Sequence, residues 1–525
     1  MPKKQFLRES KSKSKHAPKA PTTADEWLAE GVDFEEAGEK WRGGDATKSM
    51  RFFGKAIDAY ETGLRNFPDS FDLAYNIARL RYEVTQYPKL LKQLPHGTWT
   101  LASLLQQALD SSRAAINLKA DDADAQFNTG QILSSLAAEV AANSIFQGSE
   151  DTTSCSLLEE AVGFFNRCFA IQQAEFAKFE EQIASANASA SSEQTETEDA
   201  KQPAAQGASS DITSQNQSGK EEQWVSVREP VTRNDVLDTI IALVETLSTL
   251  CSRSSRLGGG QAPKFLHTVE EIGTPTLREQ LSSLSQLTER GLDGAIAQAS
   301  LISAVSEAKY RMGLPGNDFE AYINNIKTAW SNIDLQNHAQ GLWNRAETFT
   351  TASQAISDHD GQLGSGSSST ISKITKLQWE AYSLAATDLT TASKFRDDDN
   401  IGKIFITRGD IELLRAALGR GSNAFPAAQK NQEILIKNAE KYYRGAKVLT
   451  ESSREKEENE EATVKEAVVK GLLGDSSALG AVRSSVGRMD EILRDAVNDG
   501  LFDEGLLASL PLNCEVTTYQ GLALP

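Results

Sequence analysis

The chain has 525 residues, with 73 acidic against 54 basic side chains and a formal net charge of −19. This acidity disfavours nucleic acid phosphates and anionic membranes as ligands and favours basic protein partners, unless it serves solubility alone. The four cysteines form no CxxC pair, which argues against a disulfide framework and structural zinc, and no apolar run is long enough to span a bilayer. The charged N-terminus carries no secretory signal, so we expect a cytoplasmic protein, or one shared between cytoplasm and nucleus.

The first segment, residues 1–22, is rich in Lys, Ser and Pro and is predicted to be a disordered basic tail. Between Lys3 and Lys19 it carries seven basic residues against one acid, Glu9. Such a tail is either inert, a nuclear import signal or a contact for RNA. It is the one place where the sequence leaves direct nucleic acid binding open.

Helices are predicted from residue 23 to residue 183. Residues 71–84 and 123–137 place small or apolar side chains at helical spacing, without the alternation of a strand. Turn signals precede both segments, at residues 68–70 (Pro-Asp-Ser) and at residues 121–122 (Asp-Asp). We therefore expect repeated helix–turn–helix units in this part of the chain.

Beyond residue 183 the composition divides the chain into four parts. The first is rich in Ser, Ala, Gln and Glu, buries too little apolar surface to offset its ordering entropy, and is predicted to be a disordered acidic insertion. Helices follow, first without a recognisable repeat and then with one, and the last part is expected to be a cap or tail. In chain order these parts are residues 184–222, 223–360, 370–500 and 501–525.

Two four-residue passages in the predicted helices superimpose, 75–78 (YNIA) and 127–130 (FNTG). Each begins one turn into a helix and is followed by a second helix whose small and aromatic side chains lie three or four residues apart, which places them on one face. Small residues let helices approach, and an aromatic ring fills the gap between them. The residues predicted to pack these helices are Tyr75, Ala78, Phe127, Gly130, Ala161 and Phe165.

These residues resemble the tetratricopeptide repeat, a helix–turn–helix unit of about 34 residues with small and aromatic residues at fixed positions and a terminal proline. The longest match is residues 395–428, with Gly402 and Phe405 in the first helix, the inter-helix turn at 409–410, and Pro426 as the terminal proline. The resemblance implies that Gly402, Phe405 and Pro426 also pack the repeats. The two earlier units carry about 18–19 more residues between their helices than the family does. The resemblance implies an all-α solenoid with long inter-helix insertions. The alternative is a generic helical domain with alanine-rich packing.

None of the sequence motifs associated with enzyme chemistry is complete in this chain. Residues 258–264 are glycine-rich but lack the GxxxxGK[ST] spacing of a phosphate loop. Residues 397–402 are similar to the start of a calcium loop, but Arg408 stands where that loop needs glutamate. The five histidines form no HxxxH or HExxH pair, and residues 358–360 (Asp-His-Asp) are expected in a surface loop. We predict no enzyme activity, no cofactor and no metal site.

The resemblance implies that the first helix of each repeat lines a concave groove. Asn76 and Asn128 occupy the asparagine position of the clamp with which some family members capture the acidic C-termini of heat-shock chaperones. That clamp also needs basic side chains, whereas Asp124 and Gln126 stand where one is required, so we do not expect this ligand. Asn76, Asn128 and Asp124 are the candidate peptide-binding residues, because an amide both donates and accepts hydrogen bonds. The alternative is that the two amides satisfy neighbouring loops.

The predicted function is a non-catalytic, protein-binding adaptor or dedicated chaperone. Its partner is expected to be basic, such as a ribosomal protein or a histone, by analogy with acidic tetratricopeptide chaperones that escort ribosomal proteins. The alternative is a structural scaffold subunit of a larger complex, held by apolar patches rather than by charge. An enzyme of unrecognised type is the least favoured function.

Overall fold

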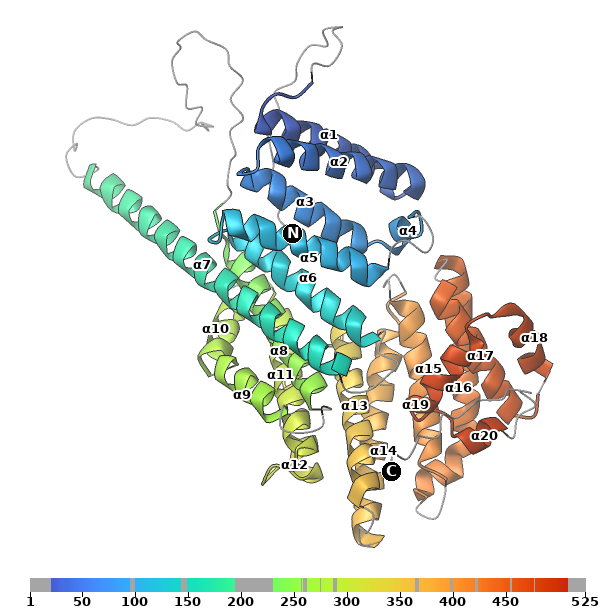
Figure 1. Ribbon diagram of the computed structural model, residues 1–525. Helices are drawn as coiled ribbons and strands as arrows, with labels where there is room; N and C mark the ends of the chain where they lie inside the picture. Colours follow the sequence, from blue (N-terminus) through green and yellow to red (C-terminus); the bar gives the residue numbers. More distant parts are fainter. Residues whose placement is uncertain are drawn as a thin grey trace, which may run out of the picture. The chain divides into compact units, whose positions relative to one another are not determined.

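The computed structural model describes the chain with gaps, and every regular element in the described part is a helix (Figure 1). The predicted fold class, all-α with consecutive helix–turn–helix pairs, is confirmed. None of the described helices combines the length and the apolar character that crossing a bilayer requires. The described residues are 20–94, 100–142, 149–193, 230–255, 257, 262–273, 275–286, 290–363, 368–396, 400–420, 424–453, 456–475 and 477–508.

The chain divides into two compact units, with the boundary after Gly294. In the first unit, α1 packs on α2, α3 on α5, and α6 on α7, each pair joined by a short connection or by a short helix. Its helices are α1 (Ala24–Arg42), α2 (Ala46–Asn66), α3 (Phe71–Thr85), α4 (Pro88–Leu91), α5 (Leu101–Leu118), α6 (Ala123–Ala142), α7 (Ser149–Glu193), α8 (Arg233–Ser254), α9 (Ala262–Ile272) and α10 (Pro275–Gln286).

The second unit begins within α11 and contains the pairs α13–α14 and α15–α16, with α17 packed on α16. Its helices are α11 (Gly291–Arg311), α12 (Phe319–Trp330), α13 (Ala339–Leu363), α14 (Ser368–Ala392), α15 (Ile401–Ala417), α16 (Pro426–Ser453), α17 (Lys456–Leu472), α18 (Ser477–Ser485), α19 (Met489–Asn498) and α20 (Glu504–Ala508).

Side-chain caps explain where the first helices begin. Thr23 accepts a hydrogen bond from the backbone N–H of Glu26, and the Glu26 carboxylate accepts one from the backbone N–H of Thr23. Asp45 caps α2 by accepting from the backbone N–H of Lys48 at 2.9 Å. Each cap satisfies donors that the first turn of a helix leaves unpaired, and contributes about 1 kcal/mol.

Glycines let the helices of a pair approach until an aromatic ring of one lies on the backbone of the other. A Cβ added at Gly130 on α6 would lie 2.7 Å from the ring of Phe165 on α7, and that ring meets Phe127 edge-on at 5.5 Å between centroids. Gly31 and Gly38 of α1 receive the rings of Tyr60 and Phe53 of α2 in the same way. The sequence therefore forms close pairs because glycine and aromatic residues face each other.

The predicted repeat at residues 395–428 is wrong in its boundaries. Residues 409 and 410 lie inside α15, which runs without a break from Ile401 to Ala417, and Pro426 is the first residue of α16 rather than the end of a helix. Gly409 is needed for helix contact, since a Cβ there would lie 2.6 Å from the Tyr443 ring of α16. Glycine is common in turns and at close helix contacts, and proline is common after a helix and in the first turn of one. The residue types alone therefore do not distinguish a turn at 409–410 from a continuous helix there.

The long insertions of the earlier units have two forms. Between α3 and α5 the chain adds residues 86–100, which include α4. In the pair α6–α7 the extra length lies mainly within α7, whose 45 residues continue to Glu193, ten residues into the predicted disordered insertion. Alanine, glutamate and glutamine are good helix formers, so this composition extends a helix as readily as it forms a linker. The rest of that insertion and residues 1–19 lie outside the described residues.

Candidate functional site

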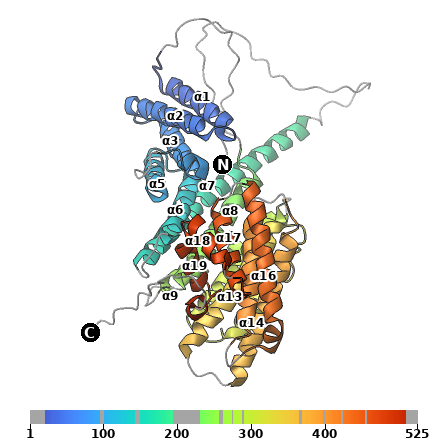
Figure 2. The ribbon, with the colours of Figure 1, turned by 90° about the vertical axis from the view of Figure 1, so that its right-hand side faces the viewer.

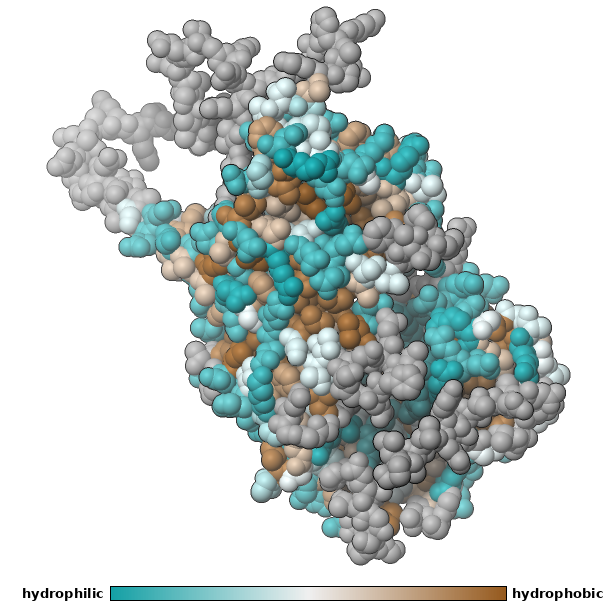
Figure 3. Space-filling view, in the orientation of Figure 1, coloured by the Kyte–Doolittle hydropathy of each residue, from teal (hydrophilic) through white to brown (hydrophobic). Residues whose placement is uncertain are grey.

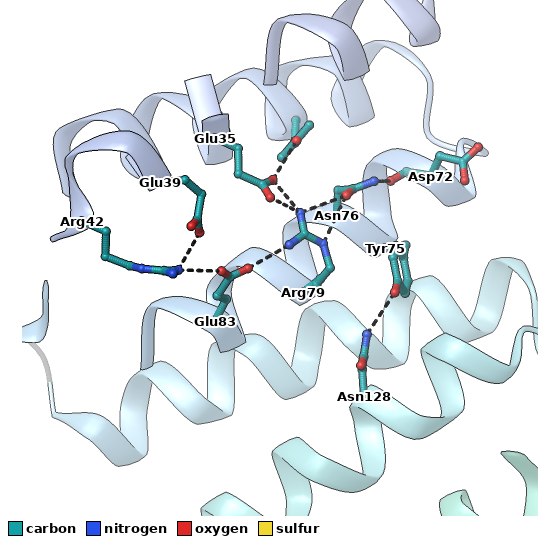
Figure 4. A network of polar contacts seen from close by, with 10 residues as sticks. Glu35, Glu39, Arg42, Asp72, Tyr75, Asn76, Arg79, Glu83 and Asn128 are labelled. Atoms are coloured by element: carbon teal, nitrogen blue, oxygen red, sulfur yellow. Dashed lines mark hydrogen bonds and ion pairs between the residues drawn. The ribbon is translucent and has the colours of Figure 1, made fainter. Parts of the chain in front are cut away.

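The two candidate asparagines lie inside the first unit, on α3 and α6 (Figure 4). The amide of Asn76 donates to the Asp72 carbonyl oxygen at 2.8 Å, and its Oδ1 accepts from Arg79. Asn128 Nδ2 donates to the hydroxyl of Tyr75 at 3.2 Å. Both side chains are buried, with 6% and 3% of their residue surface exposed. Their role in peptide binding stays a prediction, and it requires these internal bonds to open.

One basic residue contacts the acidic turn before α6, and another contacts the beginning of α6 itself. Asp122 is buried, accepts from the backbone N–H of Ala125, and pairs with Lys119 at 3.0 Å. Gln126, in the place where the clamp would need a cation, accepts from Arg167 Nε of α7 at 3.2 Å. Asp124, the third candidate, is half-buried. Sequence reasoning missed Arg167 because it lies on the second helix of the pair.

A buried arginine joins α1, α2 and α3 at the centre of Figure 4. Arg79 Nη2 donates to both oxygens of Glu35 at 2.5 and 2.6 Å, and Nη1 donates to Glu83 at 2.9 Å. Tyr60 donates to Glu35 at 3.2 Å, and Arg42 reaches Glu83 at 3.5 Å. Burial lowers the pKa of Arg79, but the adjacent Glu35 carboxylate outweighs this and the net direction is upward. Because its partners are internal, this cluster fastens three helices together.

An open cleft of about 420 Å³ lies between α2, α3 and α5. Its lining has an aliphatic part, which we name the floor (Leu64, Ala74, Ile77 and Ala114), and a polar part, which we name the rim. Figure 3 shows hydrophobic surface over α3, bordered by hydrophilic surface over the neighbouring helices. The rim residues are Glu61, Arg65, Arg81, Asp110 and Ser111.

The charges at this rim differ in how far they are satisfied. Arg81 pairs with Glu61 on one side and donates to Ser111 on the other, so it ties α2 and α5 to α3. Asp110 is exposed, and its carboxylate accepts from Gln106 at 2.9 Å. The cleft thus offers an aliphatic floor with an exposed carboxylate at its edge. Sequence reasoning missed it because the lining comes from three helices.

The described residues give little basis for reaction chemistry. No group of three or more His, Cys, Asp or Glu among them is placed to hold a metal ion. Cys155, Cys168 and Cys251 are buried and form no disulfide among the described residues, and burial raises the pKa of Cys168 to about 12. Residues 358–360, expected in a loop, lie within α13. Asp358 of this helix pairs with Arg311 at 3.0 Å. The glycine-rich residues 258–261, which were considered as a phosphate loop, lie outside the described part.

Comparisons with known proteins find limited likeness. No protein-family model matches the chain. The UPF0656 protein C926.02 of Schizosaccharomyces pombe is 30% identical over 133 residues, which are 25% of this chain and 28% of that protein. The chain therefore matches little more than a quarter of that relative.

Three solved structures cover most of the chain at low similarity. A circular tandem repeat protein with novel repeat topology has a TM-score of 0.28 and 12% identity, covering 91% of this chain and 98% of its own. The hypoxic regulator of sterol synthesis Nro1, described as a nuclear import adaptor, has a TM-score of 0.28 and 11% identity, covering 81% and 89%. Naa15/Naa10 bound to HypK-THB has a TM-score of 0.14 and 10% identity, covering 93% and 98%. The all-α fold of this chain is established by its own helices.

Proposed function

We propose that this protein is a protein-binding adaptor that holds a partner segment in the cleft between α2, α3 and α5. The observation that carries the proposal is the open, aliphatic floor of this cleft, formed by Leu64, Ile77 and Ala114 among others. Aliphatic surface at the floor of a polar-rimmed cleft favours an apolar side chain of a ligand. A protein segment supplies such an anchor together with a backbone and flanking charges.

The net charge of −19 supports a basic partner. At the cleft the exposed carboxylate of Asp110 suits a lysine or arginine beside the apolar anchor, whereas Glu61 is already paired with Arg81. Ribosomal proteins and histones combine both features, so a dedicated chaperone for such a client is the specific form of the proposal. This form predicts binding that weakens with salt.

Purification from native cells tests the partner class. The tagged protein is isolated at low salt, washed at high salt, and the co-purifying proteins are identified. A single basic protein that is lost at high salt supports the dedicated chaperone. A stoichiometric set of partners that survives the wash supports instead a structural scaffold subunit.

A filled cleft tests the site. Ala114 is an exposed cleft residue on α5, and Ala114→Trp places a large ring over the floor without entering the core. The matched control is Ala138→Trp, at an exposed alanine of α6 outside the cleft lining. We expect the low-salt partner to be lost from Ala114→Trp and kept by Ala138→Trp. Equal retention by both variants would place the binding site elsewhere.

A further inference from the structure

The outward face of α16, in the second unit, carries a stripe of basic and aliphatic side chains. Lys430, Ile434, Lys437, Lys441 and Val448 are all exposed. At 100° per residue they fall within about 60° of one another around the helix axis. Ile434 and Val448 expose 58% and 63% of their surface, more than the other large hydrophobic residues recorded as exposed. Figure 2 shows α16 along its length on the side of the second unit that faces the viewer.

This basic stripe is not the core face of a displaced helix. The opposite face of α16 is already packed, with Ala439, Tyr443 and Ala446 fully buried. The ring of Tyr443 lies on Gly409, and Gly445 receives the ring of Phe405, so α15 fixes the rotation of α16 about its axis. The exposed aliphatic side chains of the basic stripe therefore point away from a completed interface.

The charge of the basic stripe is opposite in sign to the net charge of the chain. Lys437 pairs with Glu433 at 2.6 Å, and this hydrogen bond lowers the pKa of that carboxyl. Lys430 and Lys441 form no ion pair with any residue in the described part of the chain. In a chain of net charge −19, these two lysines, eleven residues apart on either side of the exposed Ile434, form a local positive site.

We propose that the basic stripe of α16 docks an acidic, amphipathic helix of a partner protein. Aliphatic residues of that helix would cover Ile434 and Val448, and its carboxylates would pair with Lys430 and Lys441. From residue 430 to residue 448 the stripe is about 27 Å long, which matches a partner helix of about 18 residues. This surface goes beyond the cleft of the first unit, because it is opposite in charge to the chain and selects an acidic partner.

The same observations disfavour a polyanion of another kind. Duplex nucleic acid offers phosphates but no apolar surface for Ile434 and Val448, and the net charge of the chain repels it. A membrane surface requires a broad apolar face to insert, whereas this stripe has two aliphatic side chains about four turns of helix apart. An acidic helix satisfies both the charges and the aliphatic side chains.

The test uses the full chain and synthetic probes. The first probe is a fluorescent 18-residue peptide (about five turns of helix) that carries leucines on one face and glutamates beside them. The second has lysine in place of every glutamate. We expect the glutamate peptide to bind at low salt, as measured by fluorescence anisotropy. The lysine peptide can bind the cleft of the first unit, so its binding is expected to be the same for the wild type and for Ile434→Ser with Val448→Ser.

Charge reversal locates the binding. Lys430→Glu with Lys441→Glu is expected to weaken the glutamate peptide about tenfold or more, through lost pairing and new repulsion. Ile434→Ser with Val448→Ser is expected to weaken it as well. The control, Lys89→Glu with Lys92→Glu, makes the same change of charge at two exposed lysines at α4 and should leave binding unchanged. Thermal unfolding confirms that each variant is folded.

Two outcomes would overturn the proposal. One is a glutamate peptide whose affinity is the same for the wild type and for Lys430→Glu with Lys441→Glu. The other is loss of binding to duplex DNA or to phosphatidylserine vesicles in that variant while the peptide shows no binding to the wild type. The second result would assign the basic stripe to a polyanion instead.

Discussion

Two regions of the molecule, α1–α3 in the first unit and α15–α17 in the second, use one arrangement with different residues. In α1–α3, Gly31 receives the ring of Tyr60, whose hydroxyl donates to Glu35 of the same helix as the glycine. The third helix then supplies Arg79, which pairs with Glu35. A glycine, a tyrosine, an acid and a cation thus connect three consecutive packed helices.

In α15–α17 the four roles recur. Gly409 receives the ring of Tyr443, whose hydroxyl donates to Asp410 at 2.7 Å. Lys465 of α17 pairs with both oxygens of Asp410 at 3.0 Å and with Glu461 at 2.7 Å. Burial, with Asp410 next, raises the pKa of Tyr443, so its hydroxyl stays protonated as a donor.

The difference lies in spacing and in the reach of the side chains. Glu35 stands four residues after Gly31, and Arg79 reaches it with a long, branched guanidinium. Asp410 directly follows Gly409, and the single ammonium of Lys465 suffices. Both regions share the steric fit of a ring on glycine and the neutralisation of a buried charge, whereas their sequence patterns differ.

Removal of the buried cation should have the largest effect. Arg79→Met leaves Glu35 buried without its ion pair, and Lys465→Met does the same to Asp410, so each should cost about 3–5 kcal/mol. Hydrogen exchange in increasing urea reads α1–α3 and α15–α17 separately in the full chain. Each variant should lose protection in its own unit.

A double variant serves as the control for this prediction. Glu35→Leu together with Arg79→Met removes both charges, and most of the lost stability should return. A double variant as unstable as Arg79→Met alone would show that the pair acts through shape rather than charge.

Substitution of the glycines should have the next largest effect. Gly31→Ala and Gly409→Ala force a methyl group into the rings of Tyr60 and Tyr443, and overpacking costs about 1–3 kcal/mol. Gly54 lies within α2 with nothing in reach of an added Cβ, so Gly54→Ala should stabilise by about 0.5–1 kcal/mol. Thermal unfolding measures all three. Destabilisation by Gly54→Ala would contradict the distinction between contact and non-contact glycines.

Removal of the tyrosine hydroxyl group is expected to destabilise α15–α17 more than α1–α3. The Tyr443 bond to Asp410, at 2.7 Å, is shorter than the Tyr60 bond to Glu35, at 3.2 Å. Tyr443→Phe should therefore cost about 1.5 kcal/mol and Tyr60→Phe about 0.5 kcal/mol. Equal losses, measured by the same exchange experiment, would make the two hydrogen bonds equivalent.

Cys168 is a buried titratable group of another kind. Unlike Asp410, it has no basic side chain among the causes of its pKa shift. Cys168 contacts the Thr239 hydroxyl at 3.6 Å, and burial raises its pKa to about 12. The raised pKa keeps Cys168 a neutral thiol. The stability that this burial contributes is present below the ordinary pKa of a thiol and is lost as the pH rises from that value toward 12. In Cys514→Ser, the native protein should not react with a disulfide reagent at pH of about 8. Rapid reaction of Cys168 without unfolding would show that the site is open.

The sequence predicts the helices well and the contacts between them only in part. Helical spacing and turn signals locate α3 and α6 to within a few residues, because both properties are local. The predicted structural roles of Gly409 and Pro426 are wrong. Glycine occurs both in turns and at close helix contacts, and proline occurs both after a helix and in the first turn of one. Arg79 was missed because an arginine within an apolar helix gives no sign of which distant acid it meets. The cleft was missed for the same reason, as its lining comes from three helices.

The most direct measurement of the central claim is photo-crosslinking from inside the cleft. A photoreactive phenylalanine analogue replaces Ala114 in one protein and the exposed Ala138 of α6 in another, and both are illuminated in native cells. We expect position 114 to crosslink to one or a few basic proteins and position 138 not to crosslink to them. Identical crosslinks from both positions, or none from position 114, would contradict a partner-binding role for the cleft.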